Sequence, residues 1–355
     1  MRFIARLHRW LGLSIGIVFV LIGLSGSVLV YAPSIVRFLY PVLERPLPAN
    51  WRDFRPRVFE SIAAQYTPGE VLVVRFPGTE YPAYQLYLRD GAQEFRDVLS
   101  GRRLLHRGPL DDIVIIARTF HTELFGGATG EQVLGWLGFA MLALLAGGLW
   151  TWLPRRTHWR HVLRRPRIRR VHPQLTWWHK TLGVVIVGPL LLVTLTGTAL
   201  IFYAPAQALL TTALGGKPPA PPSHVVPPRA ASTDWPAVFN TLDRTLPAGR
   251  TVFFYPPQGD QPLLFRKQMP GELHPNGRSY IALTRIGKLL FANDASRAAA
   301  GMQAANAIYP LHSGRLDLAW YRALIALLGV MPLLFFASGL CMWRLRNRAA
   351  GRRSP

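Results

Sequence analysis

The sequence has little acid and almost no cysteine. Its 355 residues include one cysteine, Cys341, and 18 Asp and Glu against 41 Lys and Arg, which gives a formal net charge of +23. A single cysteine excludes an intrachain disulfide framework, cysteine-based zinc sites and iron–sulfur clusters. Half of the residues are hydrophobic and only 17% are charged, so intrinsic disorder is excluded. The mean hydropathy of +0.18 indicates long apolar runs and is unlike a basic nucleic-acid-binding module.

Four uncharged, apolar runs account for this hydropathy: residues 11–30, 133–153, 182–203 and 323–343. Each has about 20 residues, which is the length a helix needs to cross a bilayer. A soluble core helix of that length would carry a polar stripe, and these runs carry none. The first run could be a signal peptide, but it is long for one and is followed by a poor cleavage site. We therefore predict four membrane-spanning helices.

The charges separate along the chain. All 18 acidic residues lie between residues 44 and 131 or between 234 and 317. The N-terminus, the connection 155–180 and the tail from 344 hold 17 Arg and Lys and no acid. Because short Arg-rich flanks stay in the cytoplasm, we expect both termini and the middle loop to be inside and the two long segments to be outside. The basic runs then serve as orientation signals that contact lipid headgroups, and no nucleic acid is expected as a partner.

The chain is also interpreted as a tandem repeat, because residues at the ends of its apolar runs recur at fixed offsets. The matched residues are His8 with His179, Ser25 with Thr196 and Gly26 with Gly197 at an offset of 171, and His121 with His312, Gly148 with Gly339 and Trp152 with Trp343 at an offset of 191. Each half is one span, one outer domain and one span. Both halves enter from the same side, so the repeat is parallel and equivalent residues should face one another.

These patterns predict an integral membrane α-helical protein with two small α+β outer domains. The expected order is helix 1 at 1–32, outer domain 33–131, helix 2 at 132–153, basic loop 154–178, helix 3 at 179–203, outer domain 204–320, helix 4 at 321–343 and tail 344–355. In the first outer domain we expect a helix at 57–65, strands at 71–76 and 84–89, and a hairpin at 95–105. In the second we expect a helix at 235–246, strands at 251–255 and 263–267, and a hairpin at 279–291.

The candidate chemistry lies in the histidines. Of the ten, four repeat in register at the edges of the spans: His8, His179, His121 and His312. An ionisable residue at such a position is a functional candidate, and neutral imidazole is a common ligand of haem iron. Facing pairs on a pseudo-twofold axis suit bis-histidine haem b, and the lack of CxxCH excludes covalently attached haem c. Two haems at two levels would form an electron path across the bilayer.

Other readings of the histidines stay open. They could be headgroup anchors, or they could serve a proton relay or a divalent-metal site, although the four spans contain no acidic residue. His172 precedes His179 by seven residues and competes with it as a ligand. His158 and His161 lie in the basic loop. We interpret His106, His224 and His274 as surface residues, of which His106 or His274 could approach a periplasmic substrate.

The chain resembles the PepSY-associated transmembrane helix proteins. The resemblance rests on the run from His8 to Gly12 with Ser25-Gly26, on its echo at His179, and on the stretch from Phe120-His121 to Trp150. It implies a bacterial inner-membrane, iron-regulated protein with PepSY-like periplasmic domains. It further implies a haem-dependent reductase that releases iron from ferric siderophores, with the four repeated histidines as the residues carried over. The halves differ near the outer face, where Glu131 and Arg322 have opposite charge.

The function expected is therefore an inner-membrane haem b protein that reduces ferric iron, as a siderophore or another chelate, in the periplasm. No GxGxxG or other flavin or nicotinamide motif occurs, so electrons must come from a cytoplasmic reductase or from quinol. One alternative is a non-enzymatic protein whose outer domains bind or regulate a periplasmic partner such as a peptidase or an assembly factor. Another is a transport component for iron chelates.

Overall fold

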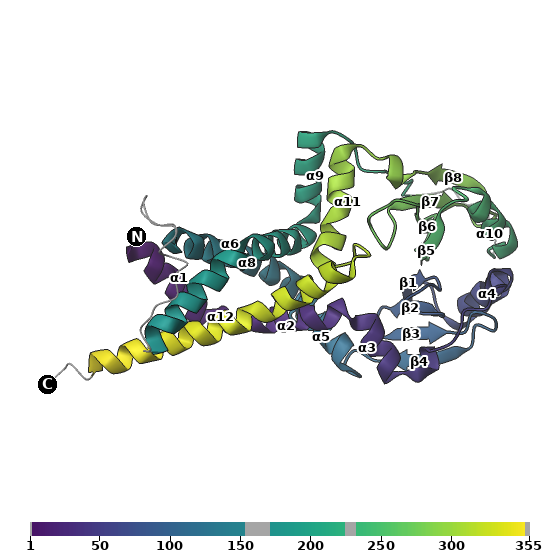
Figure 1. Ribbon diagram of the computed structural model, residues 1–355. Helices are drawn as coiled ribbons and strands as arrows, with labels where there is room; N and C mark the ends of the chain where they lie inside the picture. Colours follow the sequence, from purple (N-terminus) through teal and green to yellow (C-terminus); the bar gives the residue numbers. More distant parts are fainter. Residues whose placement is uncertain (1, 153–170, 224–231, 352–355) are drawn as a thin grey trace. The chain divides into compact units, whose positions relative to one another are not determined.

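The computed structural model describes residues 2–152, 171–223 and 232–351. They form two compact units. A helical unit draws on Met1–Val30, Ala117–Tyr203 and Leu311–Pro355, and a mixed unit draws on Tyr31–Ile116 and Ala204–Pro310. Each unit is described separately (Figure 1).

The helical unit contains the candidate membrane spans. Three helices are long and apolar enough to cross a membrane: α6 (Gly127–Trp152), α8 (Val171–Ile201) and α12 (Ala319–Gly351). The pair α1 (Arg2–Ser14) and α2 (Gly16–Val30) makes a fourth span if the two are taken together, although they are bent by 60°. The described residues thus supply three or four of the four predicted spans.

The prediction of one continuous helix over residues 11–30 is wrong, because the chain bends within this range. The bend falls at Ile15, between Ser14 and Gly16. The Ser14 hydroxyl donates to the Trp10 carbonyl at 2.7 Å, which competes with the backbone bond of the helix. Glycine and serine together are a common cause of a kink.

Two other helices are longer than their apolar runs. α8 begins at Val171, eight residues before the predicted start, with Pro173 in its first turn, where proline is tolerated. α12 continues to Gly351, into the predicted tail. The thickness of the hydrocarbon sets the length of the apolar run, whereas helix propensity and capping decide where the helix ends. Residues 154–170 of the predicted basic loop lie outside the described residues.

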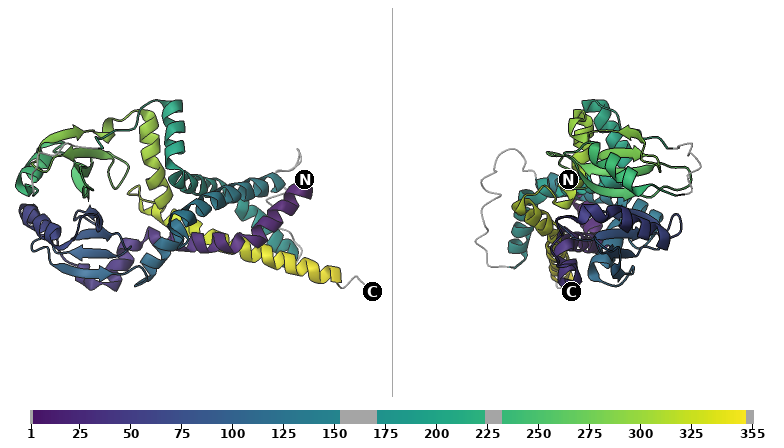
Figure 2. Two further views of the ribbon diagram at one scale, coloured as in Figure 1. Left: turned by 180° about the vertical axis from the view of Figure 1, so that it is seen from behind. Right: turned by 90° about the vertical axis from the view of Figure 1, so that its right-hand side faces the viewer.

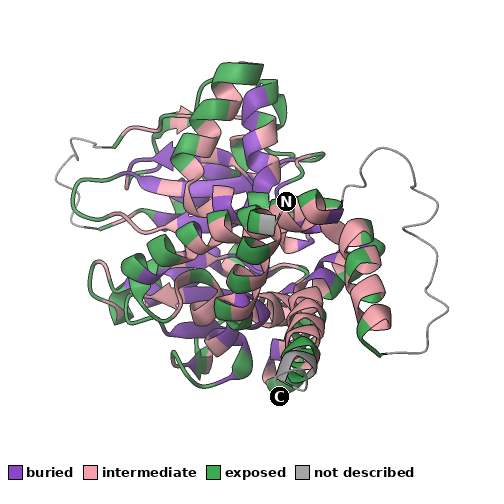
Figure 3. Cartoon of the chain, turned by 90° about the vertical axis from the view of Figure 1, so that its left-hand side faces the viewer, coloured by how far each residue is buried: buried purple, intermediate pink, exposed green. Residues whose placement is uncertain are grey.

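Small residues let the long helices approach closely. α2 runs along α12, and α8 packs against both α6 and α12 (Figure 2). The backbones of Gly23 and Gly329 touch, and the Ser27 hydroxyl donates to the Ala326 carbonyl at 2.7 Å. Such contacts are typical of helix association in membranes, where packing and interhelical hydrogen bonds replace the hydrophobic driving force. Figure 3 shows that these helices carry mostly intermediate and exposed residues, whereas the strands are largely buried.

The mixed unit contains one segment from each half of the chain. The first segment has α3 (Ala32–Leu39), η1 (Pro41–Leu43), η2 (Trp51–Phe54), α4 (Arg55–Gln65), β1 (Val71–Arg75), β2 (Tyr84–Leu88), β3 (Gln93–Arg96) and β4 (Arg103–Arg107), and leads into α5 (Ile113–Glu123). The second has α9 (Tyr203–Leu214), α10 (Trp235–Arg244), β5 (Arg250–Tyr255), β6 (Leu263–Gln268), β7 (Ser279–Leu283), β8 (Leu289–Ala292), η3 (Ala295–Arg297) and α11 (Ala300–Ser313). The expected order of one helix and four strands is confirmed in both. The hairpin glycines Gly101 and Gly287 have φ of 71° and 78°, which glycine adopts most readily.

The two sets of strands join in one antiparallel sheet. Its order is β4-β3-β2-β1-β5-β6-β7-β8, and the halves meet where β1 pairs with β5, with Val74 opposite Phe254. The sequence predicts two separate domains for these segments, but the segments share one sheet and one core. The helices α4 and α10 pack together, and the Arg55 guanidinium donates to the Asp243 carboxylate at 2.9 Å.

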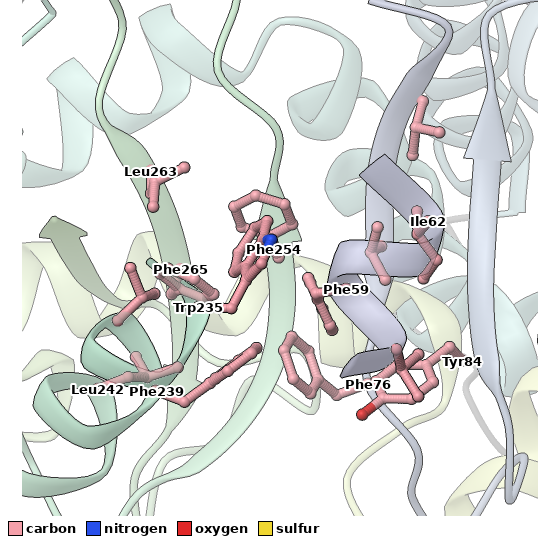
Figure 4. Packing of buried hydrophobic residues seen from close by; sticks show 14 of the residues in the cluster. Phe59, Ile62, Phe76, Tyr84, Trp235, Phe239, Leu242, Phe254, Leu263 and Phe265 are labelled. Carbon is pink, nitrogen blue, oxygen red and sulfur yellow. The ribbon is translucent and has the colours of Figure 1, made fainter. Parts of the chain in front are cut away.

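Aromatic side chains from both halves fill the shared core (Figure 4). Phe59 of α4 lies at its centre, 5.4 Å from Phe76 and 5.6 Å from Tyr84 of its own half. Its ring is equally close to the other half, at 5.0 Å from both Trp235 and Phe239 between ring centroids. Truncation of Phe59 would therefore remove contacts that hold the halves together.

We expect Phe59→Ala to lower the free energy of unfolding by about 3–5 kcal/mol, the usual cost of a large cavity in a core. Thermal unfolding of the full chain in detergent, followed by tryptophan fluorescence, measures the change. Phe38→Ala is the matched control, because Phe38 is 83% exposed. Equal loss in both variants would contradict a core shared by the two halves.

A buried carboxylate near the β4 edge generates a pH dependence. Glu94 of β3 is 3% exposed and accepts hydrogen bonds from Tyr66, Arg96 and His106 at 2.5, 2.7 and 3.2 Å. Burial by itself raises the pKa of this carboxyl, but the hydrogen bonds and the Arg96 charge outweigh it and lower the pKa below its ordinary value.

A lowered folded-state pKa means that the unfolded chain takes up the proton at higher pH than the folded chain. The free energy of unfolding should therefore fall as the pH drops below about 5 towards the folded-state pKa. Glu94→Gln should flatten this dependence, measured as the midpoint of thermal unfolding between pH 6 and 3. Glu60→Gln, at an exposed helix position, should keep the wild-type slope, and a slope unchanged in Glu94→Gln would contradict the assignment.

Candidate functional site: two histidine pairs in the helical unit

The structure brings the four repeated histidines together as two pairs. His8 of α1 and His179 of α8, the α1–α8 pair, have ring centroids 6.3 Å apart and planes at 88°. His121 of α5 and His312 of α11, the α5–α11 pair, have ring centroids 6.0 Å apart and planes at 36°. All four side chains belong to the helical unit. Each pair joins helices from opposite halves of the chain.

In the α5–α11 pair, each ring is held by a carbonyl of a neighbouring span. His121 Nδ1 lies 2.9 Å from the Ile22 carbonyl of α2, and His312 Nδ1 lies 3.0 Å from the Val193 carbonyl of α8. Ile22 and Val193 are themselves separated by 171 positions. The two rings therefore have matching partners in the two halves.

In the α1–α8 pair, the partners are a carbonyl and a hydroxyl. His8 Nδ1 lies 3.0 Å from the Leu144 carbonyl of α6, and His179 Nδ1 lies 2.8 Å from the Ser338 hydroxyl of α12. The Ser338 hydroxyl donates to the Phe335 carbonyl at 3.1 Å, so its oxygen accepts from His179. The Phe335 ring stands edge-on to the His179 ring, with centroids 5.1 Å apart.

These partners determine which ring nitrogen carries the proton. A carbonyl oxygen can only accept a hydrogen bond. The one hydroxyl hydrogen of Ser338 is already donated to Phe335, so its oxygen can only accept as well. Each Nδ1 must therefore be the donor. In neutral imidazole the other nitrogen, Nε2, then has a free lone pair. Histidines that bind metals are held in this way, by an Nδ1–H bond to a backbone carbonyl or a similar acceptor. In each neutral ring, Nε2 is thus the nitrogen with the free lone pair.

Glycines make room for three of the rings. A Cβ placed on Gly26 would lie 2.8 Å from His121 Cε1, and one on Gly197 would lie 2.7 Å from His312 Cε1. A Cβ on Gly148 would lie 3.0 Å from His8 Cε1. Any side chain at Gly26 or Gly197 would push the ring away. The sequence analysis singles out all three glycines through the repeat, and the structure shows what each one contacts.

The remaining histidines lie elsewhere. His172 is exposed in the first turn of α8, two helical turns before His179. His106 hydrogen-bonds to Glu94 and is partly exposed. The expectation that His274 is a surface residue is wrong: it is 2% exposed and stacks on Tyr309 of α11 at 5.0 Å. His158, His161 and His224 lie outside the described residues.

Sequence reasoning missed the groups that orient the rings. Leu144, Phe335 and Ser338 contribute a carbonyl, a ring and a hydroxyl from helices packed beside the histidines. A main-chain carbonyl has no residue signature, so its role depends on helix packing. Within residues 2–152, 171–223 and 232–351, no group of three or more His, Cys, Asp and Glu side chains is arranged to hold a metal ion.

The helical unit has three or four candidate membrane spans and two histidine pairs, and the mixed unit has an eight-stranded sheet. Together they define a class of multi-pass membrane protein. The chain belongs to the PepSY-associated TM region family, which it matches over residues 5–346. The match covers nearly the whole chain, as the resemblance in the sequence led us to expect. A search of curated proteins finds no match.

Proposed function

We propose that this protein is an inner-membrane haem b protein that moves electrons across the bilayer and reduces chelated ferric iron in the periplasm. The observation that carries the proposal is the meeting of four repeated histidines as two pairs, each with Nδ1 engaged and Nε2 free. We also propose that the chain is a tandem duplication, because the partners of His121 and His312 match at the offset of the repeat.

The ring separations fit one iron between each pair. An imidazole nitrogen bonds a metal at about 2 Å, and the ring centre lies roughly 1 Å behind that nitrogen, so two opposed ligands place their ring centres about 6 Å apart. The pairs stand at 6.3 and 6.0 Å. Each pair would hold one haem through its two imidazoles, and the haem would supply a redox-active iron. The glycines at positions 26, 148 and 197 leave the rings space at both sites.

At each site haem iron would supply a centre that alternates between the ferric and ferrous states and so carries one electron at a time. The chain's own residues do the rest. The Nδ1–H bonds to the carbonyls of Leu144, Ile22 and Val193 hold the rings in place. They also make the Nε2 lone pair a stronger electron-pair donor to a metal. The apolar helices keep water away, and the exclusion of water tunes the reduction potential of a metal centre. No residue need transfer a proton within the bundle, because single-electron transfer requires none.

The charge distribution supports a direction for the electrons. Because Arg-rich flanks stay inside, the α1–α8 pair would lie on the cytoplasmic side and the α5–α11 pair on the periplasmic side. A cytoplasmic reductase or quinol would deliver electrons to the first pair. At the second, one electron would convert ferric to ferrous iron, and hard oxygen chelators such as siderophores hold ferrous iron far more weakly. The family resemblance is what suggests a ferric siderophore as the acceptor.

The purified full-length protein should show a reduced b-type spectrum, with two haems per chain. His121→Ala and His312→Ala should each remove the same haem, and His8→Ala and His179→Ala should each remove the other. In the electron paramagnetic resonance spectrum of the oxidised protein, the near-perpendicular rings of the α1–α8 pair should give a highly anisotropic low-spin ferric signal. The more parallel α5–α11 rings should give a rhombic low-spin signal. His106→Ala is the control and should keep both haems. A colourless protein from haem-replete cells would overturn the proposal, and loss of different haems in His121→Ala and His312→Ala would overturn the pairing.

The glycine contacts generate a second test. Gly26→Ala places a methyl group 2.8 Å from His121 Cε1 and should displace this ring, so that haem content falls at the α5–α11 pair alone. Gly188→Ala is the matched control on a span, because nothing lies within 4 Å of its added Cβ. The pyridine haemochrome spectrum measures the number of haems per chain. The electron paramagnetic resonance signals identify which of the two haems is lost. Unchanged haem in Gly26→Ala would mean that this ring is not an iron ligand.

A further inference from the structure

A cluster of arginines stands beside the α1–α8 pair. Arg9 follows His8 directly on α1, and α1 packs against both α6 and α12. The Arg9 guanidinium is within electrostatic range of Arg6, one turn away, and of Arg346 on α12. Lys180 follows His179 directly on α8. The arginine cluster is defined here as Arg6, Arg9 and Arg346.

The cluster is exposed and has no acid on its own helices to balance it. Arg6 and Arg346 are exposed and Arg9 is partly exposed. Neither α1, α8 nor α12 contains an Asp or Glu. Arg9 therefore faces two like charges, Arg6 on its own helix and Arg346 on α12, and this repulsion lowers the stability of the arrangement. A partner that brings negative charge would relieve it.

Membrane orientation does not require such a cluster. The positive-inside effect depends on the number of Arg and Lys near the spans, and residues 155–170 alone contain eight arginines. It does not depend on arginines of α1 and α12 gathering around Arg9, the residue that follows His8. Their place beside the α1–α8 pair is where electrons would have to enter, because the chain has no flavin or nicotinamide motif of its own.

We propose that the arginine cluster is the docking surface for a small acidic protein that carries single electrons. This inference rests on the proposed function and names the class of donor. Electron-transfer complexes bury little surface, often under about 1,200 Å², and depend on opposite charge to steer the encounter. A compact cationic surface with Trp10 exposed next to it fits such a brief contact.

The test uses the full chain in nanodiscs of zwitterionic lipid, with an acidic flavodoxin as the probe. Fluorescence anisotropy of labelled flavodoxin measures binding, and stopped-flow absorbance measures haem reduction by its reduced form. The triple variant R6Q/R9Q/R346Q should weaken binding and slow reduction about tenfold or more at low salt. The difference should vanish towards 1 M salt, where charges are screened beyond about 3 Å. Reduction by photoreduced riboflavin, a small molecule that carries at most one negative charge and needs no docking surface, should change little.

The matched control is R57Q/R102Q/R244Q, which removes the same charge from exposed positions of the mixed unit and should bind flavodoxin as the wild type does. Equal binding by R6Q/R9Q/R346Q and wild type overturns the inference, as does an equal loss in the control. Loss of co-purified anionic lipid in R6Q/R9Q/R346Q with flavodoxin binding unchanged would assign the cluster to headgroups instead. Binding is measurable without haem, so a colourless protein that still binds flavodoxin through the cluster would refute the proposed function and leave the docking surface standing.

Discussion

The hydrogen bond from each histidine Nδ1 to an acceptor on a neighbouring helix is the interaction on which the candidate site depends. In an apolar bundle, a ring nitrogen without a partner is costly, so each ring turns until Nδ1 meets a carbonyl or hydroxyl. The ring from the other half then lies 6.0–6.3 Å away between ring centroids. The bond therefore selects the tautomer of the neutral ring and fixes the side of the ring that faces the neighbouring helix. At three of the four rings the acceptor is a main-chain carbonyl, which is a rigid part of a helix.

The close packing of the bundle makes these bonds possible. His121 reaches the Ile22 carbonyl because Gly26, one turn further along α2, presents no side chain to the ring. The same relation holds for His312, Val193 and Gly197 on α8. Each of these rings thus lies against the backbone of a span from the same half of the chain, and the partner ring comes from the opposite half. A bundle loosened at either glycine position would lose the geometry of a whole pair.

The two pairs are not equivalent. The α5–α11 rings both donate to carbonyls and stand at 36°, whereas the α1–α8 rings stand at 88° and His179 donates to the Ser338 hydroxyl. The α1 helix that carries His8 is also set off from α2 by a 60° bend. Both pairs consist of two histidines, but they differ in the acceptor at Nδ1 and in the angle between the rings. The basicity of Nε2 can therefore differ between the two pairs. In the mixed unit the halves likewise differ in detail while sharing one core around Phe59.

The sequence by itself determined the candidate spans, the order of one helix and four strands in each segment of the mixed unit, and the four histidines that form the candidate site. Those features come from local patterns: uninterrupted apolar runs, β-branched stretches between turn glycines, and residues that recur at a fixed offset. The tertiary structure decided the β1–β5 pairing that merges two expected domains into one sheet, the break at Ile15, the burial of His274 and the acceptors of the four rings. Strand edges and main-chain carbonyls are chemically alike all along the chain, so only the packing of distant segments determines which of them meet.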